Sequence, residues 1–395
     1  MRRSEYVVVG GGIAGASVAY HLSERTDDPV TVFDRQSLAS ETTFKSVAMT
    51  GLYGDETQYQ MKRYAHRLYN EFLAEPRANP RYEFAGRLVL ATTPETAETL
   101  RRAARGDADA GKISENSANA LMEYVPGEEL TSNLVVPELN VDAVEGALYR
   151  PKMGYMSRPQ EVAFEFVERA KENGVEFRPN TPVREIRTEN GRVTGVRTDD
   201  GAVPASNVVA AAGPWNLALT RDLGLDLPLR HTLAPALQLR PDPPLSHSLP
   251  SIEPADSPYS IYRRRDDEIL IGYYPGSYED AGTEYDPATT SDAVPAEIRE
   301  GAIDVLERLL PSLLDAEIVD EWVGVRSMTP DQNPIVGWTD IEGLSLAAFN
   351  TSGIQLAPAV GDVIARQLVD GDPTEYYDAL SVTRFDGQTD TRPSR

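Results

Sequence analysis

Residues 6–22, YVVVGGGIAGASVAYHL, decide the fold that this 395-residue sequence predicts. Residues 6–9 have the β-branched composition of a buried strand, and the run that starts at Ile13 has the small and apolar residues of a packed helix. Three glycines with the spacing Gly-x-Gly-x-x-Gly stand between them. A strand, a glycine turn and a helix in this order predict a site for a phosphate group.

Each of the three glycines has its own task in such a turn. Gly10 allows the tight reversal, Gly12 lets the backbone approach a pyrophosphate, and Gly15 lets the helix pack on the strand. Ile13 and Ala14 begin the helix, whose positive dipole end stabilises an anion. We therefore place these five residues in a predicted nucleotide site.

A second strand supports a dinucleotide rather than a lone phosphate. Val30–Phe33 is a short apolar run that ends in Asp34, and Arg35 follows. Asp34 comes 19 residues after Gly15, the usual place of a carboxylate that binds a ribose hydroxyl. The carboxylate disfavours the 2′-phosphate of NADP, so the fingerprint leaves NAD and FAD open.

Composition excludes several other kinds of site. The length suits two domains, which need not be continuous in sequence. The chain has no cysteine, which excludes disulfides, thiolate metal sites and iron–sulfur clusters. Its four histidines are scattered without a metal-binding pair, so we predict no metal.

Charge is the most unusual property of the composition. Five lysines and 33 arginines stand against 62 acidic residues, and the net charge is −24. The acidic residues are spread along the whole chain, which favours a solvated acidic surface of the kind found in very salty cytoplasm; the alternative is an ordinary acidic cytosolic protein. Nucleic-acid binding is disfavoured, because no basic stretch stands out. We expect a cytoplasmic protein without a membrane span or signal peptide.

Periodicity predicts alternating strands and helices over most of the chain. Turn signals at Asn190-Gly191 and Asp200-Gly201 predict a three-stranded meander over residues 183–203. Further strands are expected at 87–91, 175–178, 207–213, 229–239, 259–274 and 344–348. Further helices are expected at 58–75, 95–104, 118–124, 158–174, 295–310 and 354–368.

Four motifs occur in order along the chain: GGGIAGAS at 10–17, AAGPW at 211–215, WVGVRSMTPDQNPIVG at 322–337 and SGIQLAPAVGDVIA at 352–365. Together they resemble the FAD-dependent D-amino acid oxidase superfamily, in the branch of glycine oxidase, sarcosine oxidase and related amine dehydrogenases. The resemblance covers most of the chain. It implies an α/β fold, α+β overall, in which a Rossmann-like FAD-binding domain is interleaved with an antiparallel-sheet substrate domain.

The resemblance also implies domain limits. We expect residues 1–84, 150–227 and 322–377 in the FAD-binding domain and residues 85–149 and 228–321 in the substrate-binding domain. Residues 378–395 are expected to form a polar tail.

The resemblance places FAD on segments that lie far apart in sequence. Residues 42–51, TTFKSVAMTG, match the loop beside the flavin ring. A lack of cysteine in the chain and of histidine in 38–53 predicts that FAD is bound non-covalently. Besides Asp34, Arg35 and the glycine turn, the predicted FAD contacts are Thr42, Thr43, Ser46, Val183, Gly213, Gly353, Ile354, Gln355 and Leu356.

Arg326 is the predicted substrate-binding residue. In the family this position carries an arginine that clamps a substrate carboxylate, and a guanidinium fits a carboxylate bidentately. Ser327 follows it here, where the family has proline. The alternative is a structural arginine paired with Asp320, Glu321 or Asp331.

Other candidates are less specific. Lys45, one of few lysines, lies on the predicted flavin loop and would bind substrate or assist reaction with oxygen; the alternative is an ion-paired surface lysine. Met49, Tyr53 and Tyr262 are candidates for pocket walls or for core packing. His231 is a candidate active-site base.

These features predict an FAD-dependent oxidoreductase. It would oxidise the C–N bond of a small amino acid or secondary amine by hydride transfer to flavin N5, and the imine would be hydrolysed. Electrons would pass to oxygen or to a carrier. The alternatives are 2-hydroxy acid oxidation, an NAD-dependent dehydrogenase, and a non-catalytic flavoprotein that acts as an assembly factor.

Overall fold

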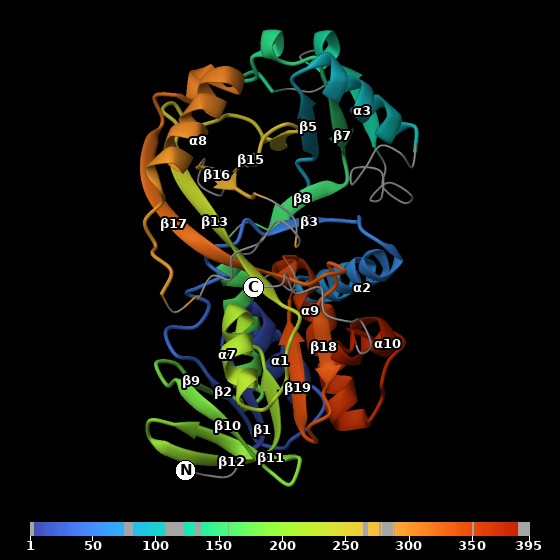
Figure 1. The fold of residues 1–395 in the computed structure, drawn as a ribbon, viewed down its shortest axis with the longest axis vertical. Coiled ribbons are helices and arrows are strands. Elements are labelled where there is room, and N and C mark those ends of the chain that lie inside the picture. The colour runs from blue at the N-terminus through green and yellow to red at the C-terminus, as the bar shows by residue number, and fades with distance from the viewer. Residues whose placement is uncertain are drawn as a thin grey trace, which may run out of the picture.

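The computed structural model describes residues 4–74, 82–106, 122–130, 136–156, 158–263, 268–275, 278, 287, 289–349 and 351–385. Two eight-stranded sheets follow one another along the long axis of the molecule, and a three-stranded sheet lies between them (Figure 1). The chain passes repeatedly from one large sheet to the other, so neither sheet is built from a continuous stretch of sequence.

The first sheet contains the glycine turn. Its strands run in the order β10-β11-β12-β1-β2-β9, and β19 pairs with both β12 and β18. The pairs β12–β1, β1–β2, β2–β9 and β12–β19 are parallel. The strands are β1 (Ser4–Val9), β2 (Val30–Phe33), β9 (Glu176–Arg178), β10 (Val183–Glu189), β11 (Arg192–Thr198), β12 (Gly201–Ala210), β18 (Ile335–Trp338) and β19 (Leu344–Ala348).

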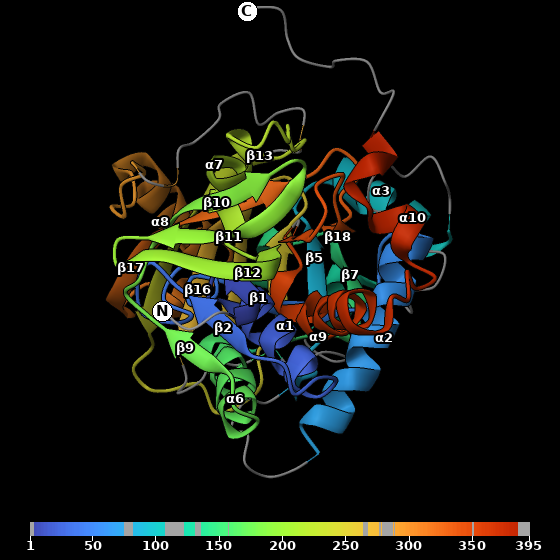
Figure 2. The same cartoon turned by 90° about the horizontal axis from the view of Figure 1, so that it is seen from below.

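Helices cover one face of this sheet (Figure 2). Apolar residues of α1, such as Val18 and Leu22, share a buried cluster with Val360 of α9 and Met61 of α2. The Asp55 side chain caps α2 by accepting a hydrogen bond from Gln58 N, 2.8 Å away. These helices are α1 (Ile13–Ser23), α2 (Glu56–Phe72), α6 (Pro159–Glu172), α9 (Gly353–Ala365) and α10 (Tyr377–Leu380). The short helix α7 (Asn216–Arg221) packs against the opposite face of the sheet.

The second sheet has the order β17-β13-β16-β15-β14-β5-β7-β6. Every neighbouring pair is antiparallel except β14–β5. The strands are β17 (Glu317–Met328), β13 (Arg230–Arg240), β16 (Ile269–Tyr273), β15 (Tyr259–Arg263), β14 (Ser251–Pro254), β5 (Arg87–Ala91), β7 (Gly146–Arg150) and β6 (Glu123–Pro126).

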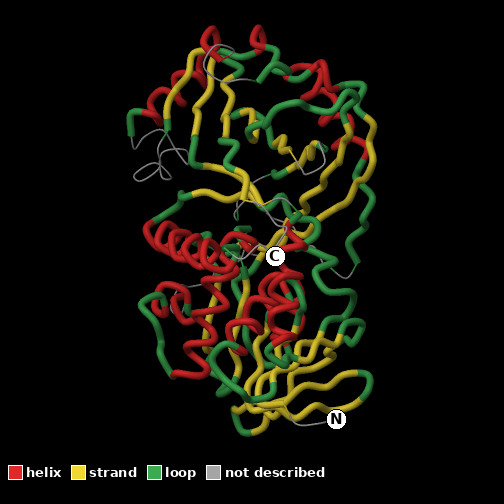
Figure 3. The backbone as a smooth tube through the Cα atoms, turned by 180° about the vertical axis from the view of Figure 1, so that it is seen from behind, coloured by secondary structure: helices red, strands yellow, loops and turns green. Residues whose placement is uncertain are grey.

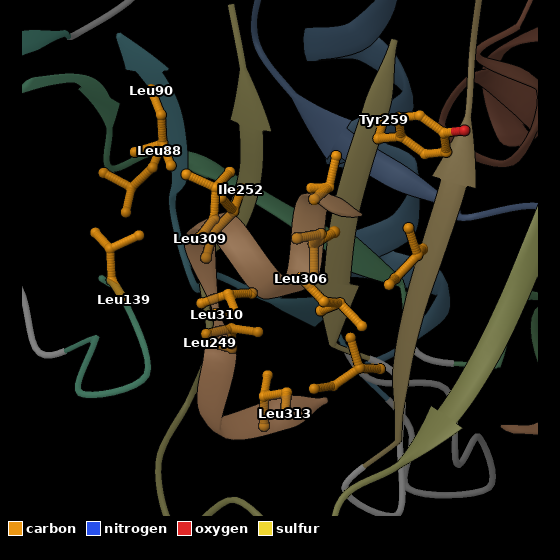
Figure 4. Packing of buried hydrophobic residues seen from close by; sticks show 14 of the residues in the cluster. Leu88, Leu90, Leu139, Leu249, Ile252, Tyr259, Leu306, Leu309, Leu310 and Leu313 are labelled. Carbon is orange, nitrogen blue, oxygen red and sulfur yellow. The ribbon is translucent and has the colours of Figure 1, made fainter. Parts of the chain in front are cut away.

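One face of the second sheet packs against α8 (Ala296–Leu309). Figure 4 shows the cluster: Leu88 of β5, Ile252 of β14 and Tyr259 of β15 lie against Leu306 and Leu309. Since side chains alternate along a strand, the residues between them point to the opposite face. The second sheet is therefore free to present polar residues on the face away from α8.

Smaller elements complete the structure. The three-stranded sheet consists of β3 (Met49–Gly51), β8 (Met153–Met156) and β4 (Tyr82–Glu83), and Figure 3 shows the same layering from behind. Helix α3 (Pro94–Ala104) starts with a Thr93–Thr96 capping box. Among the described residues, no helix is long and apolar enough to cross a membrane, and no group of three or more metal-ligating side chains occurs.

The predicted fold class, the β1–α1–β2 unit and the meander are confirmed. The helix predicted over 118–124 is wrong at its described end, because Glu123–Pro126 is an edge strand paired with β7; residues 118–121 lie outside the described residues. The first residues of the predicted tail are also packed, since Leu380 of α10 is buried. The expected domain limit at 322 falls within β17, which pairs with β13 along its length.

Candidate active site

A cavity of about 1240 Å³ lies where the two large sheets meet, and residues from both sheets line it. This volume exceeds the roughly 300–1,000 Å³ of an ordinary small-molecule site. The cavity begins at the β1–α1 turn, follows the loop after β2, and ends on the face of the second sheet that points away from α8. It has room for a long cofactor and a second, smaller ligand.

The glycine turn has the geometry that its sequence predicts. Gly10 has a φ of +109°, and a Cβ there would lie 2.4 Å from Ala211 O. A Cβ on Gly15 would lie 1.8 Å from Gly10 O, so only glycine allows α1 to pack this closely. Gly15 itself does not line the cavity, whereas Gly10, Gly12, Ile13 and Ala14 do.

The N-terminus of α1 is suited to an anion. Its N-cap residue, Gly12, has no side chain that could cap it, and the first turn of the helix contains no acidic residue. Thr43 Oγ1 accepts a hydrogen bond from Ile13 N at 3.0 Å, which joins the predicted flavin loop to the turn. The positive end of the helix dipole therefore faces the cavity.

Asp34 lies at the opposite rim of the turn. Its Oδ2 accepts a hydrogen bond from Gly11 N at 2.6 Å, and its Oδ1 accepts one from Gln36 N at 2.8 Å. Burial raises the pKa of this carboxyl, although the two backbone hydrogen bonds act in the opposite direction. The guanidinium of neighbouring Arg35 lies 4.0 Å from the centre of the Trp215 ring, and both residues line the cavity.

The other predicted FAD contacts come from distant segments. A second uncapped helix N-terminus, that of α9, meets the same cavity through Gly353 and Ile354. Gln355 and Leu356 do not line it; the Gln355 side chain instead donates to Gly51 O at 2.8 Å. The cavity is also lined by Thr42, Thr43, Ser46, Val183 and Gly213.

Arg326 of β17 points into the cavity and is held by neutral groups. Its Nε donates to Thr232 Oγ1 at 3.0 Å and one Nη donates to Pro275 O at 3.2 Å. Its guanidinium lies 5.7 Å from the centre of the Tyr274 ring. Burial lowers the pKa of this guanidinium.

No described carboxylate pairs with Arg326. The three alternatives considered from the sequence have other partners: Glu321 pairs with Arg299, Asp331 with Arg384, and Asp320 accepts from the backbone of Glu321. Arg326 is thus a partly buried cation that lines the cavity. A bound anion would complete its electrostatics.

Lys45 has a different environment. Its Nζ lies 2.6 Å from Asp292 Oδ1 and 3.4 Å from Glu41 Oε2, although the residue lines the cavity. The alternative of an ion-paired lysine therefore describes this side chain. Its backbone oxygen accepts a hydrogen bond from Trp322 Nε1 at 3.3 Å, which fixes the loop against β17.

The remaining candidates separate into wall and core residues. Met49, Tyr53 and Tyr262 line the cavity. His231 does not: its Nε2 lies 3.0 Å from Pro214 O, and the ring is buried. Its neighbour Thr232 faces Arg326, so strand alternation directs His231 to the other side of β13. The prediction that His231 is a pocket residue is therefore wrong.

Sequence reasoning missed five charged residues that line the cavity, and three of them lie on the second sheet. Arg87 of β5, Arg150 of β7 and Glu253 of β14 all line the cavity, and Arg87 forms an ion pair with Glu253. Each stands alone among apolar or small residues without a motif. The one available signal was an arginine at the end of an apolar strand, which is ambiguous without strand pairing.

Comparison with known proteins identifies the class. The sequence matches the FAD dependent oxidoreductase family over residues 5–367, and the chain therefore belongs to this family. The family assignment resolves the choice that the glycine fingerprint left open, in favour of FAD over NAD. The two uncapped helix ends, Asp34 and the length of the cavity fit this cofactor.

The names of individual relatives include two oxidases and a regulatory subunit. Glycine oxidase of Pseudomonas putida is 28% identical, over 93% of this chain and 95% of its own length. The mouse regulatory subunit of pyruvate dehydrogenase phosphatase is 28% identical over 97% of this chain and 43% of its own length. 4-Methylaminobutanoate oxidase of Paenarthrobacter nicotinovorans is 27% identical over 98% of this chain and 46% of its own length. The chain thus spans a little under half the length of the latter two relatives.

Solved structures agree on the fold. Glycine oxidase from Geobacillus kaustophilus superposes with a TM-score of 0.80 at 24% identity, covering 97% of this chain and 99% of that chain. L-proline dehydrogenase from P. horikoshii also gives 0.80, at 23% identity and 98% coverage of both chains. At these identities the likeness establishes the architecture alone.

Proposed function

We propose that this protein oxidises the C–N bond of a small amino acid or secondary amine, whose imine product is then hydrolysed. When bound, FAD would supply the acceptor for the α-hydrogen as a hydride, and oxygen or a carrier would be the final acceptor of the electrons. The observation that carries this proposal is Arg326, a partly buried arginine that lines the cavity and pairs with no described carboxylate.

Arg326 would bind the substrate carboxylate and set its orientation. Thr232 and Pro275 O hold two of its N–H groups, so the guanidinium plane is fixed before substrate arrives. A fixed anchor contributes through proximity, because it holds the α-carbon in one place. Ser327, which stands where the family has proline, pairs with His231 in the ladder of β17 and β13.

Aromatic side chains would form the rest of the substrate pocket. Tyr262 is buried at the cavity wall, and its ring centre lies 6.5 Å from that of Tyr274. Burial raises the pKa of the Tyr262 hydroxyl well above its usual range, so the hydroxyl stays protonated and can donate a hydrogen bond. Together these rings exclude water from the α-carbon.

The proposal needs no strong base. All four histidines belong to the described residues, and none of them lines the cavity. A neutral amine can lose its α-hydrogen as hydride once it is oriented, so positioning by Arg326 suffices. The same absence of histidine from the wall, in a chain without cysteine, supports non-covalent binding of FAD.

Anaerobic reduction of the purified flavoprotein tests this proposal. Candidate amines such as glycine, sarcosine and D-alanine are mixed with the protein, and bleaching of the flavin absorbance is followed. Arg326→Met should retain FAD and lower kcat/KM for a carboxylate substrate by about 100-fold or more, since a charge-assisted pair is lost. Arg326→Lys should recover part of the loss. Equal kinetics in the wild-type protein and Arg326→Met would contradict the role of the arginine.

Two other functions are outcomes of the same experiment. Reduction by 2-hydroxy acids and not by amines would assign C–O oxidation, since Arg326 would bind either carboxylate. A protein that retains FAD and is reduced by neither class would match a regulatory role, as in the name of the mouse relative. Reoxidation of the reduced protein in air distinguishes oxygen from a carrier as acceptor.

A further inference from the structure

A buried lysine lies against one tyrosine of the cavity wall, and the proposed function uses neither residue. Lys62 of α2 is 1% exposed. Its Nζ donates a hydrogen bond to Tyr53 O at 2.9 Å and lies 3.3 Å from the centre of the Tyr53 ring. Tyr53 lines the cavity, whereas Lys62 does not. Lys62 is therefore expected to act on a ligand only through Tyr53.

Lys62 forms no ion pair with a carboxylate among the described residues. Burial lowers its pKa, and the attraction of Tyr53 and Asp55 acts in the opposite direction. The Asp55 carboxylate is already engaged, because it accepts hydrogen bonds from Gln58 N at 2.8 Å and from Asn333 Nδ2 at 3.0 Å. The ammonium instead contacts the carbonyl and the ring face of Tyr53. An aromatic ring face attracts a cation, and a phenolate ring, with its full negative charge, attracts it more strongly than a phenol.

The partner of the Tyr53 hydroxyl acts in the same direction. The hydroxyl forms a hydrogen bond with the side chain of Ser352, which is the N-cap residue of α9. Ser352 also lines the cavity. The positive end of the α9 dipole therefore lies beside the hydroxyl and favours a negative charge there.

Charged side chains from several elements surround Tyr53. They are Lys62 of α2, Arg87 of β5, Arg150 of β7 and Glu253 of β14. Burial opposes ionisation of the hydroxyl, but the charges of Lys62 and Arg87 and the hydrogen bond of Ser352 outweigh it, so the pKa of Tyr53 is lowered. Tyr53 differs in this from Tyr262, another tyrosine of the cavity, whose pKa is raised by burial.

We propose that Tyr53 is a catalytic residue that accepts the proton of the substrate's ammonium group, and that Lys62 is the positioning residue that keeps Tyr53 ready for this step. An amine in neutral water is mainly the ammonium, which has no electron pair on nitrogen. In the proposed step an N–H bond of the ammonium breaks, an O–H bond forms on Tyr53, and nitrogen keeps the electron pair. The proton passes to water after the product leaves.

This step would precede the loss of the α-hydrogen, which requires a neutral amine. The inference rests on the proposed function, because it takes an amine as the substrate. Tyr53 follows β3 of the small sheet, whereas Arg326 is on β17 of the second sheet, and both line the cavity. A substrate whose carboxylate is bound at Arg326 would direct its ammonium group away from β17, toward the part of the cavity that Tyr53 lines.

The first test measures the ionisation of Tyr53 and needs no turnover. The FAD-loaded full-length protein and Tyr53→Phe are titrated with base, and the ultraviolet absorbance of phenolate is followed. The difference between the two curves is the signal of one tyrosine among the 18 of the chain. Its midpoint should lie below the ordinary tyrosine pKa of about 10. A midpoint at or above this value would overturn the proposal.

The second test follows anaerobic flavin reduction by a small amine such as sarcosine as a function of pH. Tyr53→Phe keeps the ring against Lys62 and removes the proton acceptor. At neutral pH it should lower kcat/KM by about 100-fold or more, the effect of losing a general base. The deficit should shrink as the pH approaches the pKa of the free amine, because the amine then binds already neutral. An equal deficit at every pH would assign Tyr53 a structural role and reject the proposal.

Tyr124→Phe is the matched control for this test. Tyr124 of β6 also has a cation against its ring, with the Arg101 guanidinium 4.7 Å from the ring centre, but it does not line the cavity. Tyr124→Phe should keep the wild-type pH profile. Lys62→Met should move both the Tyr53 midpoint and the rise of kcat/KM to higher pH. If Lys62→Met does not fold, Tyr53→Phe still decides, since it removes a single hydroxyl.

The results distinguish this inference from the proposed function. Reduction of the wild-type protein and Tyr53→Phe with the same pH profile would overturn the role of Tyr53 and leave amine oxidation standing. A wild-type protein that no amine reduces at any pH would overturn both. A low midpoint together with a deficit that shrinks at high pH would support both.

Discussion

The partners of a charged residue decide whether it is available to a ligand. Arg326 and Lys45 are both cations beside the cavity, and both were candidates from the sequence alone. Arg326 is held by a hydroxyl and a carbonyl, which leave its charge uncompensated. Lys45 already pairs with Asp292 and Glu41. The sequence ranked Arg326 above Lys45, and the tertiary contacts supply a physical reason for that order.

For Lys45 we predict a small and indirect effect. Because Asp292 is largely exposed, the ion pair contributes less than about 1 kcal/mol. Lys45→Met and Asp292→Asn should therefore each change kcat/KM by less than about fivefold, and the double variant should resemble either single one. Steady-state kinetics of the four proteins checks this. A hundredfold loss in Lys45→Met alone would show direct contact with the reaction.

His21 should make stability depend on pH. The ring is buried between α1 and α9, where it faces Asp362 at 4.0 Å and the guanidinium of Arg25, which also pairs with Asp362. Burial lowers the pKa of His21 to about 4, despite the attraction of Asp362. The unfolded chain therefore takes up this proton first as the pH falls, and stability is lost between about pH 6.5 and pH 4.

The size of this effect follows from the shift. Between pH 7.5 and pH 5, His21 should account for a loss of about 2 kcal/mol in the free energy of unfolding. Urea unfolding of the wild-type protein and His21→Gln at both pH values measures it, and the variant should lose less than the wild-type protein by that amount. Carboxylates that titrate in the same range cancel in this comparison. Identical losses in the two proteins would contradict the assignment.

At the scale of elements, different glycines of the β1–α1 turn serve folding and cofactor binding. Gly15 is required by the packing of α1 on β1, because its Cβ would overlap the backbone of Gly10. Gly12 has a φ of −74°, and its Cβ would approach only Thr43 Oγ1, at 3.1 Å. The fold itself therefore does not require a glycine at position 12. The glycine is required only by the close approach of a ligand.

Two alanine variants test this separation. Gly15→Ala should destabilise the apoprotein by about 2–4 kcal/mol, since neither side of the contact can move without displacing the helix. Gly12→Ala should leave the apoprotein melting temperature within about 2 °C, yet weaken FAD binding about tenfold or more. Thermal melts without FAD and fluorescence titration with FAD measure the two effects. Equal destabilisation by both variants would contradict the distinction.

The same scale explains what the sequence could predict. The β1–α1–β2 unit, Asp34 and the α9 start are local: each is readable because strand, turn and helix follow one another within about thirty residues. The charged residues that the second sheet gives to the cavity wall are non-local. Arg87, Arg150 and Glu253 meet only because β5 pairs with β7 across 54 residues of intervening chain and with β14 across 159 residues. No periodicity in a single strand indicates which distant strand lies beside it.

At the scale of the whole molecule, the cavity is suited to anions although the protein as a whole is strongly acidic. Under the proposed function, helix N-termini beside the first sheet would face the phosphates of the cofactor, and arginines of the second sheet would face the substrate. The exterior is acidic, with 62 acidic residues against 38 basic ones. The cavity therefore attracts anions through a surface that repels them, and salt in the medium would reduce that repulsion.

Salt should also stabilise the fold. Exposed arginine–carboxylate pairs such as Arg184–Asp199 and Arg197–Glu185 use part of the acidic charge, but the excess of 24 negative charges remains. Repulsion among them is screened when the Debye length falls from about 10 Å at 0.1 M salt to about 3 Å at 1 M. We expect the melting temperature of the FAD-loaded protein to rise by about 10 °C or more between 0.1 M and 2 M KCl.

Sucrose of equal osmolality is the control, because it stabilises by exclusion without screening and should produce a smaller rise. Unchanged melting and full activity in dilute buffer would contradict the halophilic interpretation, and the acidic surface would then serve solubility alone.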